Sequence, residues 1–197
     1  MTEPRRYRFK PAALKQPASY ALDADRLQAD DGWELRLAEV DAAAFVNHVM
    51  QGARMMRLDL WVAGERRSLS YTGAANAWQS DPDAATFLRL ARDTLRALDG
   101  ATTGLRIALG ETGRARWGMF IIGLVSALGG IAIFVAALAS GISQDRLAAA
   151  AVPMLVLAAM GGILTVRYGP WRKPPMATPA ALAGVIDGIV GTLPERR

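Results

Sequence analysis

Two apolar runs, residues 117–142 and 147–166, most constrain how this chain of 197 residues can fold. Neither run contains a charged residue, and only the four residues 143–146 separate them. At about 1.5 Å per residue, a helix made from either run can cross a hydrocarbon core of about 30 Å. Because the connection is so short, the two helices must be antiparallel neighbours. The sequence therefore predicts a transmembrane helical hairpin within residues 111–168.

Small residues recur at four-residue spacing in both runs, and such spacing lets two membrane helices approach closely. We predict that the helices pack through Gly123, Ala127, Gly130, Ala158 and Gly162. The same small-residue faces could instead join separate hairpins, so a self-assembling hairpin oligomer is an alternative.

Basic residues gather at the outer ends of the two runs, whereas the connecting loop has only Arg146, beside Asp145. The positive-inside rule then places both termini in the cytoplasm, and we expect a multi-pass protein of a bacterial inner membrane. Aromatic residues at the same outer ends are typical of a membrane interface. The residues expected to contact the interface or lipid headgroups are Arg114, Arg116, Trp117, Arg167, Tyr168, Trp171, Arg172 and Lys173.

The remaining chemistry is sparse. The chain has no cysteine and a single histidine, His48, which excludes disulfides, thiol nucleophiles and metal sites built from cysteines or a histidine pair. His48 lies among apolar neighbours and is interpreted as a hydrogen-bonded structural residue. The net charge of +5 comes largely from arginine, and we attribute it to the membrane flanks. We therefore expect no catalytic residue, metal, cofactor, small-molecule substrate or nucleic-acid partner, and no enzyme.

Residues 1–18 form an extended basic arm in this interpretation. Basic side chains alternate loosely with Tyr7 and Phe9, and three prolines interrupt any regular element. The arm either lies on anionic headgroups or pairs at a sheet edge through residues 7–9, and we favour the sheet edge.

Between residues 19 and 71 the apolar pattern has a period of two, which predicts short antiparallel strands joined by tight turns. Residues 56–62 make the clearest half-buried strand. Residues 42–51 have apolar side chains on both faces, Phe45 and Val49 on one and Val46 and Met50 on the other, which suits a strand covered on both sides. Leu105 begins a stretch that could add one more strand.

Helical spacing replaces the strand pattern at residues 81–98. Asp81 is a good N-cap, Pro82 suits the first helical position, and Gly100 is placed to end the helix. An apolar face including Phe87 and Leu95 is expected to cover the sheet. Four residues are expected to face water: Arg89, Arg92, Asp93 and Arg96. The predicted fold class of residues 19–110 is α+β.

The segments 19–27 (SYALDADRL) and 32–41 (GWELRLAEVD), the long strand 55–62, Gly64 and the terminal helix resemble the bacterial pleckstrin-homology-like (PH-like) domains. Several of those are tethered to the inner membrane by helical hairpins. The resemblance implies an antiparallel curled sheet capped at one end by the helix. It does not transfer a phosphoinositide site, which requires clustered basic residues. In this chain the first turns contain acidic residues instead: Asp23, Asp25, Asp30 and Asp31.

Residues 169–197 are predicted to form a cytoplasmic proline-rich linker and a short amphipathic helix. Thr178 would cap this helix, with Pro179 at its first position. Its apolar stripe, the candidate surface for docking a partner, comprises Leu182, Val185, Ile186, Ile189, Val190 and Leu193. The helix must dock either on its own domain or on a partner.

The sequence thus favours a membrane-anchored, non-enzymatic adaptor, an accessory or assembly subunit of a membrane protein complex. Its expected partners are membrane lipids and other membrane protein subunits or a second copy. A lipid-headgroup binding or membrane-sensing protein is the first alternative, and the self-assembling hairpin is the second.

Overall fold

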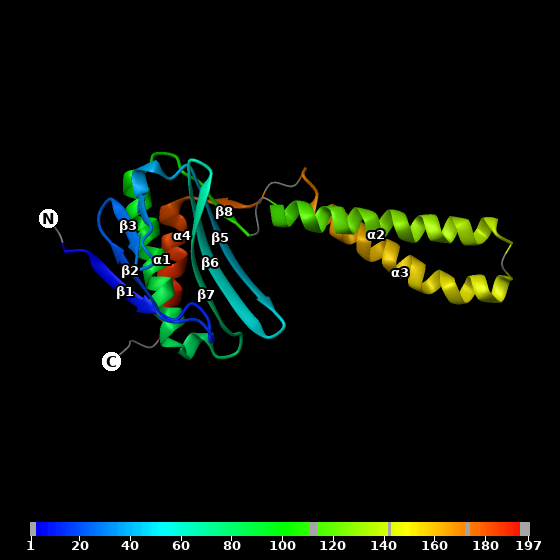
Figure 1. Cartoon of the computed structure of the whole chain (residues 1–197), viewed down its shortest axis with the longest axis horizontal. Coiled ribbons are helices and arrows are strands. Elements are labelled where there is room, and N and C mark those ends of the chain that lie inside the picture. The colour runs from blue at the N-terminus through cyan, green and yellow to red at the C-terminus, as the bar shows by residue number, and fades with distance from the viewer. Residues whose placement is uncertain (1–2, 111–113, 142, 172–173, 194–197) are drawn as a thin grey trace. The chain divides into compact units, whose positions relative to one another are not determined.

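The computed structural model describes residues 3–110, 114–141, 143–171 and 174–193 of the chain. The chain divides into two compact units. We call Met1–Gly110 together with Pro175–Arg197 the globular unit, and Glu111–Pro174 the hairpin unit (Figure 1). The sequence of the globular unit is therefore interrupted by the whole hairpin unit.

The globular unit begins with a four-stranded antiparallel meander, which we call sheet A. Its strands are β1 (Arg5–Phe9), β2 (Ala18–Leu22), β3 (Arg26–Ala29) and β4 (Glu34–Arg36). Alternate side chains, among them Phe9, Tyr20, Leu27 and Leu35, point into the core. Strand β1 pairs with β2 along its whole length. Residues 5–9 of the predicted basic arm are thus the edge strand of sheet A, the favoured one of the two alternatives.

The second sheet, sheet B, has the strand order β7-β6-β5-β8-β9. Its strands are β5 (Ala42–Met50), β6 (Ala53–Val62), β7 (Glu65–Ala74), β8 (Ile107–Leu109) and β9 (Met176–Ala177). Two-residue turns, Gln51-Gly52 and Ala63-Gly64, join β5 to β6 and β6 to β7, and all four residues have positive φ. Such turns match the twist of a hairpin. Strand β8 is parallel to β5, and every other pair in sheet B is antiparallel.

Two helices, α1 (Pro82–Ala101) and α4 (Pro179–Val190), lie side by side between the two sheets (Figure 1). The side chain of Asp81 accepts a hydrogen bond from the Asp83 amide, as the cap prediction requires. Helix α1 continues past Gly100 to Ala101, so Gly100 does not end it. Two short 3-10 helices complete the unit, η1 (Leu37–Glu39) and η2 (Trp78–Ser80). The α+β class and the antiparallel strands predicted from the sequence are confirmed.

An aromatic cluster marks the centre of the core. The ring of Phe9 on β1 stacks on Tyr20 at 5.4 Å between centroids and meets the edge of Phe87 on α1 at 5.8 Å. Phe87 also stacks on Tyr71 of β7 at 6.3 Å. Sheet A, α1 and sheet B are therefore joined through one buried ring, that of Phe87.

The chain leaves and re-enters the globular unit at adjacent strands. Strand β8 precedes the hairpin unit and β9 follows it, and the two pair antiparallel. The amide of Leu109 donates to the carbonyl of Pro175 at 2.8 Å. Both ends of the hairpin segment are thus fixed at one edge of sheet B. After β9, the chain forms α4, which completes the globular unit.

The hairpin unit consists of two antiparallel helices, α2 (Arg114–Ala139) and α3 (Gln144–Tyr168), the second containing Pro153. Within them, Trp117–Ala139 and Ala149–Tyr168 are long and apolar enough to cross a membrane. Large apolar side chains such as Val125 and Ile163 point away from the partner helix and are exposed. The described residues therefore include two candidate membrane spans.

Candidate functional site

The small residues of α2 and α3 set how closely the two helices approach. A Cβ atom added at Gly123 would lie 2.8 Å from the Leu164 Cβ and 2.9 Å from the Gly161 carbonyl oxygen. At Gly130 an added Cβ would lie 3.1 Å from the Ala158 amide nitrogen. These distances leave no room for larger side chains, so Gly123, Gly130 and Ala158 lie where the sequence placed them, at the helix crossing.

One member of the predicted set lies elsewhere. A Cβ added at Gly162 would meet nothing within 4 Å, whereas one added at Gly161 would overlap the backbone of Ala127. The correct contact is Ala127 with Gly161, one position before the predicted glycine. The reason is the rotation of α3 about its axis, which places Gly161 and Leu164 toward α2. The spacing of four could not resolve this because Gly161 and Gly162 are adjacent.

Aromatic rings cluster at the open end of the hairpin unit. Trp117 contacts Phe120 edge to face at 5.7 Å, and Phe120 contacts Trp171 in the same way at 5.7 Å. Phe120 was not among the predicted interface residues, although it lies three positions after Trp117 on the same helical face. Arg167 is exposed and Tyr168 half-buried.

The other predicted interface residues are basic. Arg114 and Arg116 belong to the first turn of α2, and their side chains are not among those described. Arg172 and Lys173 lie outside the described residues. The expected interface role of these four residues stays a prediction.

The apolar stripe of the C-terminal helix is used mostly inside the globular unit. Leu182, Ile186, Val190 and Leu193 are buried in its core, because α4 packs along α1. Of the two docking alternatives, α4 therefore docks on its own domain, and these four side chains are not free for a partner. Ile189 is half-buried, and Val185 is 63 % exposed.

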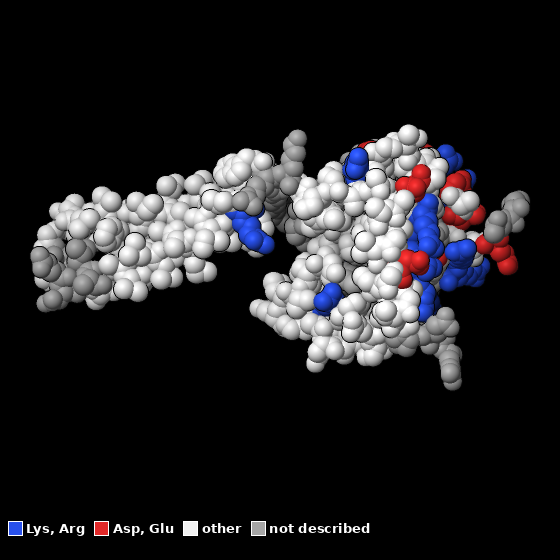
Figure 2. Space-filling model, turned by 180° about the vertical axis from the view of Figure 1, so that it is seen from behind, with Lys and Arg blue, Asp and Glu red and all other residues white. Residues whose placement is uncertain are grey.

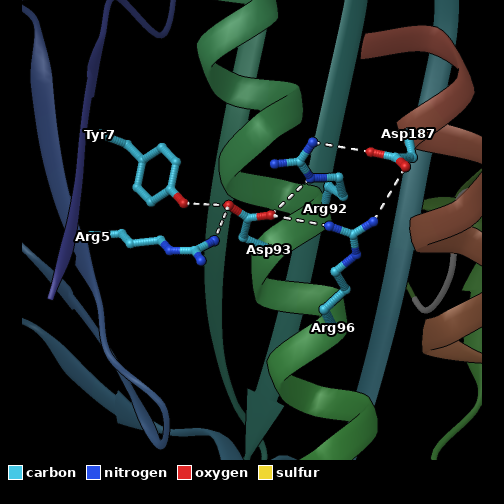
Figure 3. Close-up of polar contacts among 6 residues, drawn as sticks. All are labelled: Arg5, Tyr7, Arg92, Asp93, Arg96 and Asp187. Carbon is cyan, nitrogen blue, oxygen red and sulfur yellow. Dashed lines mark hydrogen bonds and ion pairs between the residues drawn. The ribbon is translucent and has the colours of Figure 1, made fainter. Parts of the chain in front are cut away.

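A polar cluster joins three elements that are distant in sequence (Figure 3). The carboxylate of Asp93 on α1 accepts hydrogen bonds from the Tyr7 hydroxyl at 2.6 Å and from Arg5 at 3.2 Å, both on β1. It also accepts from Nε of Arg92 at 2.7 Å. Arg92 then reaches Asp187 of α4 at 3.0 Å, and Arg96 reaches the other oxygen of Asp187 at 3.2 Å.

The prediction that Asp93 faces water was wrong. Its side chain is 7 % exposed, because β1 and α4 cover the side of α1 that looked polar in the sequence. Burial acts to raise the pKa of the Asp93 carboxyl, but the hydrogen bonds from Arg92 and Tyr7 outweigh it and hold the pKa below its ordinary value. Burial, together with the hydrogen bond to Asp93, raises the pKa of Tyr7 to about 12. The cluster holds β1, α1 and α4 together through these hydrogen bonds and ion pairs.

A second buried carboxylate, Asp59, lies on β6. It faces the side of sheet B opposite to the core residues Leu58 and Leu60, as the alternation of a strand requires. Its oxygens pair with Nε of Arg57 at 2.8 Å and with the Ser68 hydroxyl at 2.5 Å. These partners satisfy both oxygens of the carboxylate.

An apolar groove of about 430 Å³ runs between α4 and the inner face of β5 and β6, and we call it the α4 groove. Its lining includes Phe45, Met56, Leu88, Ile186, Ile189 and Arg54. Among the described residues that line the groove, Arg54 is the only charged one. Its guanidinium lies over the ring of Trp78 at 4.5 Å and donates to the Asn47 side-chain oxygen at 3.1 Å.

Charges are distributed unevenly over the surface. On the face drawn in Figure 2, basic and acidic side chains lie close together on the globular unit, whereas the described residues of the hairpin unit show almost no charge. His48 is half-buried on β5. Within the described part of the chain its imidazole makes no hydrogen bond, which differs from its interpretation as a hydrogen-bonded residue. No three His, Asp or Glu side chains among the described residues gather as ligands for a metal ion.

The sequence matches no protein-family model, and no curated protein sequence matches it significantly.

Proposed function

We propose that this protein is a membrane-anchored, non-enzymatic adaptor: the hairpin unit spans a bacterial inner membrane and the globular unit binds a partner protein in the cytoplasm. The observation that carries the proposal is where the hairpin segment is inserted in the sequence of the globular unit, namely between the paired strands β8 and β9. Because β8 and β9 pair beside each other, both ends of the hairpin segment leave from the same edge of sheet B. A hairpin held in this way would keep the globular unit at one membrane face.

The charge pattern supports the orientation. Both termini belong to the globular unit, so they share one side of any membrane that the hairpin crosses. Basic residues lie at the open end of the hairpin, and the positive-inside rule assigns that end to the cytoplasm. The cluster of Trp117, Phe120 and Trp171 suits the headgroup level at this end.

The resemblance to bacterial PH-like domains belongs to the same proposal. The order of strands β1–β7 followed, after the 3-10 helix η2, by α1 supports it, because the resemblance implies a curled antiparallel sheet and a terminal helix. The elements β8, β9 and α4 would then be additions that attach the domain to the hairpin.

Photo-crosslinking in native membranes tests the adaptor function. A photoreactive amino acid is placed, one position at a time, at exposed sites spread over the globular unit, with Ile163 on the exposed face of α3 as the lipid-facing control. The adaptor function predicts that several globular positions crosslink the same protein, identified by mass spectrometry. If only self-crosslinks appear, the self-assembling hairpin oligomer is favoured instead. If only lipid adducts appear, the lipid-binding function is favoured.

A further inference from the structure

One edge of β5 is paired with a neighbouring strand over only part of its length. Strand β8 pairs with Ala43–Phe45, but β5 continues to Met50. The amide of Gly110 donates to the Phe45 carbonyl at 2.9 Å, and Gly110 itself has a positive φ of 106°. Among the described residues, no strand pairs with this edge beyond Phe45.

The backbone groups on this open edge can be assigned. Because the Phe45 carbonyl points toward β8, the two-residue repeat of a strand directs the backbone N–H and C=O of Asn47 and Val49 to the same side. Those of Val46 and His48 face β6 instead. The open edge is also accessible, since the side chain of Val49 is 53 % exposed and that of Met50 is 62 % exposed. Unpaired edge groups of this kind accept an added strand.

The α4 groove adjoins this edge on the inner face of sheet B. Phe45 and Asn47 of β5 line the groove, and Val185 and Ile189 of α4 line its other wall. A strand added to β5 would direct every second side chain into the groove, since successive side chains alternate between faces. The groove offers these side chains a mostly apolar lining.

Arg54 gives the groove a charge preference. Its Nε is buried without a hydrogen-bond partner, and no carboxylate of the described residues lies within ion-pair distance of it. A carboxylate arriving beside this guanidinium would form a charge-assisted hydrogen bond in a partly desolvated site. The open edge itself, residues 47–50, carries no acid, so a second copy of the chain paired through β5 could not supply this carboxylate from its own edge.

We propose that the β5 edge at Asn47 and Val49, together with the α4 groove, binds an extended segment of a partner protein. The segment adds to sheet B as a strand, places apolar side chains in the groove at alternate positions, and directs one carboxylate to Arg54. This inference rests on the proposed adaptor function, for which it names the docking site and the chemistry of the partner.

The test uses the full chain in lipid nanodiscs as bait for a phage-displayed library of random linear peptides. The expected consensus has apolar residues at alternate positions and one Asp or Glu. The consensus peptide, made synthetically with a fluorophore, is then titrated by fluorescence anisotropy. Peptides N-methylated at every second amide distinguish an added strand: one register should abolish binding and the other should leave it intact, because only alternate amides of an added strand face β5.

Two matched pairs of variants locate the site on the chain. Val49→Pro removes the edge-facing N–H and is expected to weaken binding by about tenfold, whereas Val49→Ala keeps it and should stay within about threefold. Arg54→Glu should weaken binding of the acidic peptide by about tenfold or more and favour the same peptide with Lys in place of its acid. Arg66→Glu, an exposed change on β7, makes the same change in net charge and should leave binding unchanged. Circular dichroism confirms that each variant is folded.

Other outcomes would overturn the inference. One is a consensus without alternation or without an acid. Another is binding by Val49→Pro and by Arg54→Glu that equals binding by the wild type. A third is a dimer of the wild type that Val49→Pro dissociates, which would assign the edge to a second copy. The two proposals fail separately. A partner crosslinked equally by the wild type, Val49→Pro and Arg54→Glu leaves the adaptor function standing and rejects this site.

Discussion

At the scale of residues, Asp93 connects the parts of the globular unit. Its carboxylate binds Tyr7 and Arg92 directly, and Arg92 extends the contact to Asp187. These residues come from β1, α1 and α4, which lie on both sides of the hairpin unit in sequence. The cluster therefore ties the segment that follows the hairpin to the segment that begins the chain.

Replacement of Asp93 tests how much this cluster stabilises the fold. Asp93→Asn is expected to lower the free energy of unfolding by about 2 to 3 kcal/mol, because buried donors on Tyr7 and Arg92 lose a charged acceptor. The matched variant Asp187→Asn, at a half-exposed carboxylate, should cost no more than about 1 kcal/mol. Urea unfolding of the purified protein measures both. Equal losses for the two variants would mean that the cluster is only a surface ion-pair network.

The pH dependence of stability follows from the same contacts. Because the folded pKa of Asp93 lies below its ordinary value of 3.8, its contribution is fully present above that value and is lost as pH falls through the folded pKa. Wild-type stability should therefore decline more steeply below about pH 4 than that of Asp93→Asn. Identical acid limbs in urea unfolding would contradict the pKa shift.

At the scale of elements, α4 is part of the core of the globular unit and not a free tail. Ile186 is 1 % exposed between α1 and sheet B, whereas Val185, the preceding residue, points to solvent. Ile186→Ala should lower the free energy of unfolding by about 2 to 5 kcal/mol, and Val185→Ala should change it by about 0.5 kcal/mol or less. Thermal unfolding followed by circular dichroism compares them, and similar effects would indicate that α4 is detached in solution.

Helix packing in the hairpin unit provides a second test at this scale. Gly161→Ala places a methyl group against the backbone of Ala127 and should weaken the α2–α3 contact by about 1 to 3 kcal/mol. Gly162→Ala adds the same group in open space and should be neutral or slightly stabilising. Unfolding in mixed detergent micelles with increasing SDS measures the difference. A larger effect at Gly162 would reverse the assignment of the interface.

Sequence patterns predicted the elements that depend on neighbouring residues. The caps Asp81 and Thr178 and the apolar runs of α2 and α3 are local signals, and they preceded helices as expected. Contacts between distant segments were not predictable in the same way. Asp93 looked exposed because the pattern of α1 alone cannot reveal that β1 and α4 cover it. The choice between Gly161 and Gly162 likewise depends on helix rotation, which the spacing does not specify.

At the scale of the whole molecule, the hairpin is an insertion in one folded unit. Side chains of residues 3–110 and 175–193 share a single core, so that core is incomplete without the segment that follows the hairpin. Truncation before Thr178 would remove Leu182, Ile186 and Val190 from that core. For this reason, a partner lost on such a truncation would report unfolding of the domain, and point variants are the informative tools.

In the proposed topology, the hairpin crosses the membrane and holds the globular unit, built from both ends of the chain, in the cytoplasm. The chain contains no cysteine, so single introduced cysteines can be labelled cleanly. Ser143→Cys, in the connection between α2 and α3, and Arg66→Cys, on β7, are treated with a membrane-impermeant maleimide in intact cells and again after permeabilisation. We expect residue 143 to be labelled in intact cells and residue 66 to be labelled only after permeabilisation. Labelling of both residues in intact cells, or of neither residue until permeabilisation, would contradict this topology, since the two residues would then lie on the same side of the membrane.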